Sequence, residues 1–221
     1  MTPYYEADGI FIYHGDCAEI APQLGMFDLL CTDPPYGIGE ARKNHGEIRK
    51  APGGGKFRVK PSDRDDWDDA PPGQPLIDGL RSKARWQCLF GGNYFAMPPS
   101  PCWLVWDKEN GETDFADAEL AWTNYTGAVR LRRHRWNGML RLGNEQRYHP
   151  TQKPLAVMTW AISLCPERPT SVFDPFMGSG TTLRACKDLG IPRAVGIERE
   201  EKYCEIAVRR LAQRTLFDAG T

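Results

Sequence analysis

FDPFMGSGTT, residues 173–182, joins a predicted strand to a predicted helix. Gly178 and Gly180 let the backbone approach a ligand closely, and the N-terminus of the following helix offers free N–H groups to a carboxylate. The next strand pattern ends at Glu198, about twenty residues on, where an acid can bind the ribose hydroxyls of a nucleoside cofactor. Asp174, an anion inside the turn, disfavours a pyrophosphate and favours a ligand that carries an ammonium or sulfonium group.

A second motif, DPPYG at residues 33–37, directly follows an apolar run. An acid at the carboxyl end of a strand faces a binding crevice in open α/β sheets, and two prolines remove the backbone N–H groups of the turn. The site is therefore rich in acceptors and suits the amino group of a flat ring. Asp33 and the Pro34 carbonyl could each accept an N6–H bond of adenine while Tyr36 stacks on the base, without a covalent intermediate. An ordinary capped proline turn remains open for this motif alone.

The segments around both motifs alternate between strand and helix patterns. Strands are predicted at residues 10–13, 27–32, 87–90, 102–106, 171–173 and 194–197, and helices at residues 18–24, 76–85, 153–164, 181–189 and 201–213. Nearly all-apolar strands of this kind are typical of a parallel sheet that is covered on both faces, so we expect an α/β fold. Residues 37–75 are predicted to lack regular structure, and residues 119–142 to form short strands and turns.

Length and composition narrow the class of protein. A chain of 221 residues with a formal net charge of −1 predicts one domain, residues 1–221, in which any nucleic acid must be held by a local basic surface. No apolar run approaches the ~20 residues of a membrane span, and the N-terminus has no signal layout, so we expect a cytoplasmic protein without a membrane partner. The seven scattered cysteines predict reduced core thiols and no metal site.

Four segments in a fixed order carry a resemblance to a known family. They are Asp33–Tyr36, Gly91–Phe95, His149–Pro154 and Phe173–Gly180. In this order the chain resembles the β-class amino-methyltransferases of DNA, in which the catalytic motif precedes the cofactor motif, and it is similar to compact phage or prophage members. The resemblance implies a Rossmann-like, circularly permuted methyltransferase fold with a mostly parallel seven-stranded sheet. It further implies S-adenosylmethionine as the methyl donor, a flipped-out base in double-stranded DNA and a monomer or homodimer.

The resemblance also implies roles for individual residues. The catalytic residues would be Asp33, Pro34, Pro35 and Tyr36, and the cofactor site would comprise Asp16, Asp33, Lys153, Asp174, Pro175, Phe176, Gly178, Ser179, Gly180, Thr181 and Glu198. Within this set Glu198 would hold the ribose, Asp16 the adenine of the cofactor, and residues 151–153 the wall beside its methionine end. For Asp16 a helix N-cap and for Lys153 a surface lysine remain alternative interpretations.

Arginines mixed with aromatic residues indicate where DNA would bind. A small target-recognition insert is expected at residues 107–148, and its size favours a short or degenerate target sequence. The candidate DNA contacts are Arg130, Arg132, Arg133, Arg135 and Asn137, with Lys43 and Lys56 in a flexible loop at residues 38–75 as candidate phosphate contacts. A solvated charged edge strand is the alternative interpretation of the arginines.

We therefore expect a site-specific DNA adenine-N6 methyltransferase, of the kind found in restriction-modification systems. The main alternative is cytosine N4, which needs the same chemistry; in the resembled family Asp is commoner at the first motif position for adenine and Ser for cytosine. Cytosine C5 methylation needs a cysteine nucleophile, but Cys102 opens an apolar strand and is predicted to be a core residue. RNA and protein-glutamine methyltransferases usually place the cofactor motif first. A catalytically silent DNA- or cofactor-binding protein would not need the full set of acids.

Overall fold

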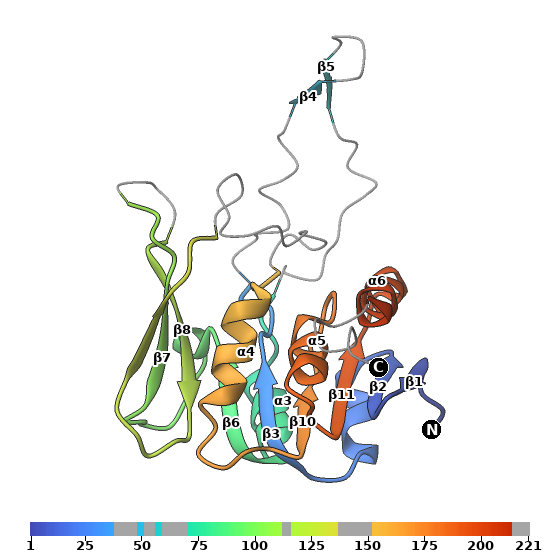
Figure 1. The fold of residues 1–221 in the computed structure, drawn as a ribbon, viewed down its shortest axis with the longest axis horizontal. Coiled ribbons are helices and arrows are strands. Elements are labelled where there is room, and N and C mark those ends of the chain that lie inside the picture. Colours follow the sequence, from blue (N-terminus) through green and yellow to red (C-terminus); the bar gives the residue numbers. More distant parts are fainter. Residues whose placement is uncertain (38–47, 51–55, 59–69, 112–115, 137–151, 214–221) are drawn as a thin grey trace, which may run out of the picture.

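One large sheet forms the centre of the described structure. The computed structural model describes residues 1–37, 48–50, 56–58, 70–111, 116–136 and 152–213 (Figure 1). Its main sheet has nine strands in the order β1-β2-β11-β10-β3-β6-β8-β7-β9. The strands are β1 (Tyr5–Ala7), β2 (Ile10–His14), β3 (Phe27–Thr32), β6 (Ala84–Phe90), β7 (Trp103–Asp107), β8 (Ala118–Thr123), β9 (Arg130–Arg133), β10 (Ser171–Asp174) and β11 (Arg193–Glu198).

The sheet is mostly parallel, as expected, but the prediction of seven strands was wrong. Strands β2, β11, β10, β3 and β6 pair in parallel, β8 is antiparallel to both β6 and β7, and β9 is parallel to β7. The sheet continues into a short strand at each edge, β1 beside β2 and β9 beside β7. Neither edge strand contains a buried apolar pattern, so only its pairing with a neighbour makes it a strand.

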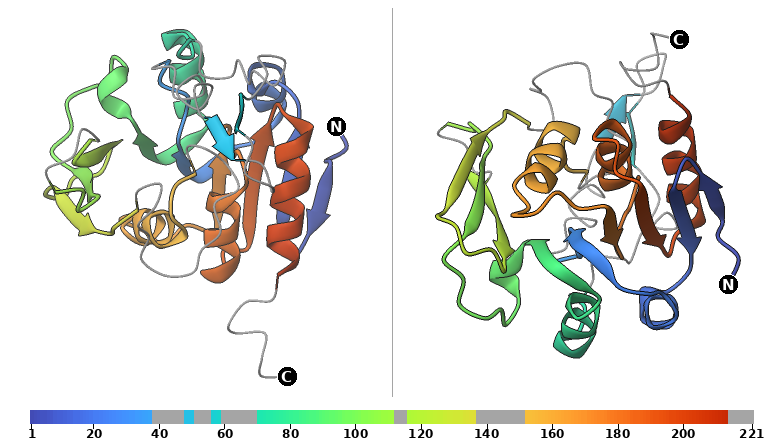
Figure 2. Two further views of the ribbon diagram at one scale, coloured as in Figure 1. Left: turned by 90° about the horizontal axis from the view of Figure 1, so that it is seen from above. Right: turned by 60° about the horizontal axis from the view of Figure 1, so that its bottom comes forward.

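Helices cover both faces of the sheet (Figure 2). α4 (Leu155–Ser163), α5 (Thr181–Asp188) and α6 (Glu201–Ala212) lie on one face, and α1 (Cys17–Ile20) and α3 (Gln74–Arg81) on the other. Two short 3-10 turns, η1 (Ala21–Gln23) and η5 (Gly92–Tyr94), complete the described helical elements. Leu29 and Cys31 pack into the first core layer and Leu30 into the second, which explains why β3 is apolar at nearly every position.

Two predicted helices have different bounds in the structure. The helix expected at residues 76–85 ends at Arg81, because Ala84 is buried and pairs with Phe27 as the start of β6. The helix expected from residue 153 begins at Leu155, because Pro154 is its extended N-cap residue. Lys153 therefore lies in the extended segment before α4, and its side chain is not part of a helix surface.

The expectation that residues 37–75 lack regular structure was wrong in two places. Gln74 and Pro75 belong to the first turn of α3. β4 (Ile48–Lys50) and β5 (Lys56–Arg58) pair antiparallel as a separate two-stranded sheet. The sequence between them contains Gly53, Gly54 and Gly55, which we read as a loop signal; between two short strands a glycine-rich connection also predicts a hairpin. Lys56 belongs to β5, whereas Lys43 lies outside the described residues.

Two expectations from composition can be compared with the fold. All seven cysteines are buried and free, which confirms the core-thiol prediction and includes Cys102. No helix in the described ranges is long and apolar enough to cross a bilayer.

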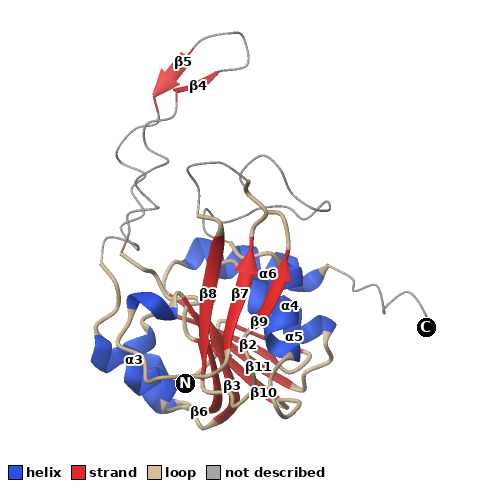
Figure 3. Cartoon of the chain, turned by 90° about the vertical axis from the view of Figure 1, so that its left-hand side faces the viewer, coloured by secondary structure: helices blue, strands red, loops and turns tan. Residues whose placement is uncertain are grey.

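The two predicted motifs lie side by side because their strands are neighbours. β3 and β10 pair in parallel, with Leu30 opposite Phe173. The carboxyl ends of parallel strands share one edge of the sheet, so Asp33 and Asp174 emerge next to each other. Figure 3 shows this central part of the sheet beside the group formed by β7, β8 and β9.

Candidate active site

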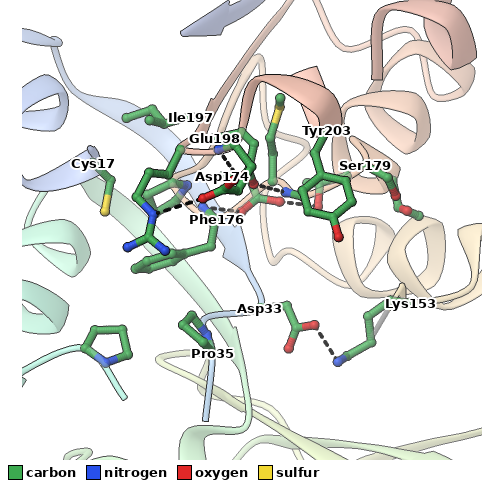
Figure 4. Close-up of a pocket in the computed structure, with 18 of the residues that line it drawn as sticks. Cys17, Asp33, Pro35, Lys153, Asp174, Phe176, Ser179, Ile197, Glu198 and Tyr203 are labelled. Atoms are coloured by element: carbon green, nitrogen blue, oxygen red, sulfur yellow. Dashed lines mark hydrogen bonds and ion pairs between the residues drawn. The ribbon is translucent and has the colours of Figure 1, made fainter. Parts of the chain in front are cut away.

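A cavity of about 280 Å³ opens at the carboxyl ends of β3, β10 and β11 (Figure 4). Most of the predicted cofactor residues line it, and so does Pro35 of the predicted catalytic motif. These cofactor residues are Asp16, Asp33, Lys153, Asp174, Pro175, Phe176, Gly178, Ser179, Thr181 and Glu198. Pro34, Tyr36 and Gly180 do not line it, and Thr151 lies outside the described residues. Gln152 belongs to the wall that was predicted at residues 151–153, whereas sequence reasoning missed other lining residues, among them Met158 and Tyr203.

Asp174 is buried among neutral hydrogen-bond donors. Its carboxylate is 2% exposed and accepts from the Thr32 hydroxyl at 2.7 Å and the Thr182 hydroxyl at 2.5 Å. The Phe176 backbone N–H also donates to it, at 3.1 Å. Burial raises the pKa of Asp174 to about 6, although these hydrogen bonds oppose the shift. The side chain thus fixes the turn while it keeps an uncompensated negative charge at the wall of the cavity.

Glu198 ties the glycine turn to the end of β11. Its two carboxylate oxygens accept backbone N–H bonds, from Gly178 at 3.0 Å and from Glu200 at 2.8 Å. Burial raises the pKa of this carboxyl as well, against the effect of both hydrogen bonds. Like Asp174, Glu198 is held by neutral donors and faces the cavity with its charge unpaired by any cation in the described contacts.

The glycine turn is clamped from α6. Gly180 has φ +76°, and a Cβ at this position would lie 2.7 Å from the Cβ of Ala207, so a side chain would separate the turn from the helix. Arg210, buried in α6, donates to the Ser179 carbonyl at 2.8 Å and to the Thr181 hydroxyl at 3.0 Å. Sequence reasoning missed Arg210. Its position on the apolar side of an amphipathic helix pattern is the sequence signal that its side chain is buried.

Asp33 lies at the other side of the cavity, between a lysine and a tyrosine. The Lys153 ammonium approaches its carboxylate at 2.6 Å, and the Tyr36 hydroxyl donates to the other carboxylate oxygen. Figure 4 shows Asp33 and Lys153 pointing toward each other. Burial raises the pKa of Asp33, and the Lys153 charge opposes this rise. Lys153 is 6% exposed, so the surface-lysine interpretation is wrong.

The ring of Tyr36 is fixed by two residues of the 91–95 turn. It stacks on Tyr94 with 4.8 Å between ring centroids and 15° between planes. Gly91 has φ +66°, and a Cβ there would lie 1.9 Å from the Tyr36 ring. Any side chain at position 91 would collide with this ring, so the turn requires glycine there.

A second carboxylate reaches Lys153 from β8. Glu119 lies 2.8 Å from the Lys153 ammonium and 2.5 Å from that of Lys108, which follows β7. Burial would raise the pKa of Glu119, but the two lysines outweigh it and lower the value to about 2. Neither Glu119 nor Lys108 was predicted from the sequence, where they were two charges among many.

Asp16 both caps a helix and lines the cavity. It is the N-cap of α1, where one carboxylate oxygen accepts from the Ala18 backbone N–H at 2.8 Å, and it also lines the cavity. A carboxylate has further acceptor sites, so the cap leaves it able to bind a ligand.

The predicted DNA-binding arginines lie on the edge strand. Arg130, Arg132 and Arg133 belong to β9, Arg135 follows it and is exposed, and Asn137 lies outside the described residues. Arg133 pairs with Asp107, the last residue of β7, at 3.3 Å. Because β9 runs parallel to β7, and β7 runs in the direction of β3, Arg133 lies at the same edge of the sheet as the cavity.

The residues of the cavity fit a positively charged nucleoside such as S-adenosylmethionine. Asp174 and Glu198 supply negative charge at one side, and Phe176, Ile197 and Tyr203 supply apolar and aromatic wall. Backbone N–H groups of the glycine turn lie at the start of α5, where a carboxylate is favoured. The cavity thus offers acids for the cationic end of such a cofactor, an apolar slot for its base and a helix N-terminus for its carboxylate.

Comparisons with known proteins agree with this geometry. A family model described as a DNA methylase, of the N6 and N4 methyltransferase type, matches residues 100–209. Type II methyltransferase M2.DpnII of Streptococcus pneumoniae is 36% identical over 267 residues, which cover 95% of this chain and 92% of the relative.

Solved structures match along most of the chain. A crystal structure of an M1.HpyAVI–SAM complex has a TM-score of 0.55 at 25% identity and covers 91% of this chain and 100% of that chain. PvuII DNA methyltransferase, described as cytosine-N4-specific, has a TM-score of 0.59 at 13% identity and covers 97% of this chain and 90% of that chain. The second likeness is one of fold alone.

Proposed function

The chain belongs to the N6 and N4 DNA methylase family, and we propose that it methylates N6 of an adenine flipped out of double-stranded DNA. Its methyl donor is S-adenosylmethionine. The permuted β-class order is part of the same proposal and is supported by the position of the Asp33 motif, which precedes the glycine turn in the sequence. The observation that carries the proposal is the Asp33 carboxylate, half-buried at the rim of the cofactor cavity beside Lys153 and Tyr36.

Adenine is favoured because the first position of the DPPY motif is an acid. An exocyclic amino group is a weak nucleophile, since its lone pair is delocalised into the ring. The Asp33 carboxylate can accept one N–H bond and the Pro34 carbonyl the other, which draws the nitrogen toward tetrahedral geometry. A carboxylate has about four acceptor sites, so the contacts of Asp33 with Lys153 and Tyr36 leave room for this bond.

The remaining site residues hold and orient the reactants. When bound, S-adenosylmethionine supplies an electrophilic methyl group next to this amino nitrogen. Asp174 and Glu198 would offer their charge to the cationic end and the ribose, and Asp16 would accept from the amino group of the cofactor base. Tyr36 and Tyr94 provide the aromatic surface for the target base. Arg132 and Arg133 would contact phosphates and place the duplex at this edge of the sheet.

Methyl transfer to unmethylated genomic DNA tests the proposal directly. Labelled S-adenosylmethionine should give N6-methyladenine on nucleoside analysis, and Asp33→Ala should lower the rate at least ~100-fold because a transition-state acceptor is lost. The cofactor affinity of this variant, measured by calorimetry, should stay close to that of the parent protein.

Asp78→Asn is a suitable control, because it removes an exposed carboxylate of α3 that pairs only at the surface with Arg81. It should retain full activity. Formation of N4-methylcytosine would keep the mechanism and replace the base, whereas cofactor binding without transfer to any DNA would contradict the proposal.

A further inference from the structure

The cation beside Asp33 has a second anionic partner that the proposed chemistry does not use. Lys153 is almost fully buried and lies between the carboxylates of Asp33, at 2.6 Å, and Glu119, at 2.8 Å. Its ammonium also lies 3.3 Å from the Tyr36 hydroxyl oxygen. The ammonium donates to Asp33 and to the Tyr36 hydroxyl and is held to Glu119 as an ion pair, so oxygens of three residues together define its position.

The outer end of this arrangement is fixed by another lysine. Lys108 lies 2.5 Å from Glu119 and 5.1 Å above the ring of Trp106. The four charges therefore alternate in sign, in the order Asp33, Lys153, Glu119 and Lys108, and we call them the charge chain. They come from separate elements, the ends of β3 and β7, strand β8 and the segment before α4, which only the folded chain brings together.

Buried charges of this kind are costly unless each has a partner. Without Glu119, the whole ammonium charge of Lys153 would act on Asp33 and hold its carboxylate as a closed ion pair. With Glu119 present, the charge of Lys153 is shared between two anions, and Asp33 keeps acceptor capacity for an incoming amino group. The second carboxylate thus affects both the direction and the basicity of the first.

We propose that Glu119 is a positioning residue of the methyl-transfer site, which shares Lys153 with Asp33 and so keeps the Asp33 carboxylate open to the amino group of the target base. Lys108 holds Glu119 in this role. The inference rests on the proposed function for the base, but the arrangement of charges that it describes does not depend on which base is methylated.

The groups that face Asp33 have opposite effects on its proton affinity. Burial raises the pKa of Asp33, the Lys153 ammonium lowers it, and the Glu119 carboxylate raises it. Tyr36 donates to Asp33 and lowers its pKa, and the neighbouring carboxylate of Asp174 repels it. Removing Glu119 should therefore lower the pKa of Asp33, and removing Lys153 should raise it, because each change deletes one charge of known sign.

The test compares Glu119→Gln with Lys153→Met over the pH range of activity. In Glu119→Gln, kcat should fall about tenfold, since a displaced acceptor is less effective, while KM for S-adenosylmethionine stays within about twofold. The acid limb of kcat/KM should move to lower pH in Glu119→Gln and to higher pH in Lys153→Met. Loss of packing alone would not move the two limbs in opposite directions.

Two further variants complete the design. Glu167→Gln is the matched control, because it makes the same substitution in an exposed ion pair with Arg85 at 2.6 Å, and it should change neither kcat nor the acid limb. Glu119→Asp retains the charge. The acid limb of its kcat/KM profile should therefore lie at the same pH as in the parent protein, although its kcat falls.

A readout without turnover separates this inference from the proposed function. Carbon-13 NMR titration of the Asp33 carboxyl in the cofactor-free protein, assigned with Asp33→Asn, should show the same opposite displacements. If the parent protein transfers no methyl group, the NMR result still decides the role of Glu119. The inference is overturned if Glu119→Gln matches Glu167→Gln, or if it moves the Asp33 titration in the same direction as Lys153→Met.

Discussion

The two sides of the cavity bury carboxylates in different ways. On the cofactor side, Asp174 and Glu198 are held by hydroxyl and backbone N–H groups, and burial raises the pKa of both. On the side of the target base, Glu119 is held by two ammonium groups, which lower its pKa to about 2. Asp33 combines the two kinds of contact, because it pairs with the Lys153 ammonium and accepts from the Tyr36 hydroxyl, and its pKa is raised.

The proposed function gives a physical reason for this difference. Neutral donors orient an acid without cancelling its charge, so the cofactor side remains negative and attracts a cationic cofactor. Fixed cations cancel the charge and fix the direction of the acid, which suits a neutral base that needs a well-placed acceptor. Substitutions and pH changes on each side of the cavity test this difference between the two kinds of carboxylate.

The largest effect is expected when the central cation is removed. Lys153→Met leaves the half-buried Asp33 carboxylate without its counterion and should lower the free energy of unfolding by about 3 kcal/mol. Thr182→Val removes one neutral donor from Asp174 and should cost only about 1–2 kcal/mol. Denaturant unfolding at neutral pH measures both values, and equal losses in the two variants would remove the distinction between the two sides.

An intermediate effect is expected on the cofactor side when the pH changes. The free-protein pKa of Asp174 is about 6, so a fall in pH through this value neutralises the carboxylate that the cationic cofactor needs. The dissociation constant of S-adenosylmethionine should rise about tenfold between pH 7 and pH 5, and Asp174→Asn should abolish most of this dependence. Titration calorimetry at several pH values would show it, and a constant affinity would indicate that Asp174 acts only within the turn.

The smallest effect is expected outside the cavity. Arg133 is exposed and pairs only loosely with Asp107, so Arg133→Ala should leave cofactor binding intact and weaken DNA binding several-fold. The slope of log affinity against log salt should decrease by about one, as expected for one lost phosphate contact. Fluorescence anisotropy with short duplexes measures this slope, and an unchanged slope would favour the solvated edge strand.

Much of the fold could be predicted because local patterns and burial agree there. β3 was predicted with its observed bounds, and β10, β11, α5 and α6 within one or two residues, since apolar strands and an amphipathic helix carry their environment in their own sequence. The short strands β1 and β9 lack such a pattern and form through pairing with a neighbour. The hairpin of β4 and β5 was missed because glycines mark a turn and a loop alike.

The amino-acid sequence was sufficient to predict that Asp174, the glycine turn and Glu198 would line one cavity, since they lie at the ends of strands that share one edge of a parallel sheet. It could not determine the charge chain. Lys108 and Glu119 lie in stretches of mixed charge, and nothing in the sequence around Lys153 shows that this lysine is buried. The position of Lys153 between two carboxylates is a property of the folded chain. The burial of a charged side chain and its distance from other charges distinguish a solvated surface residue from a positioning residue. Both are set only when the strands have assembled into the sheet.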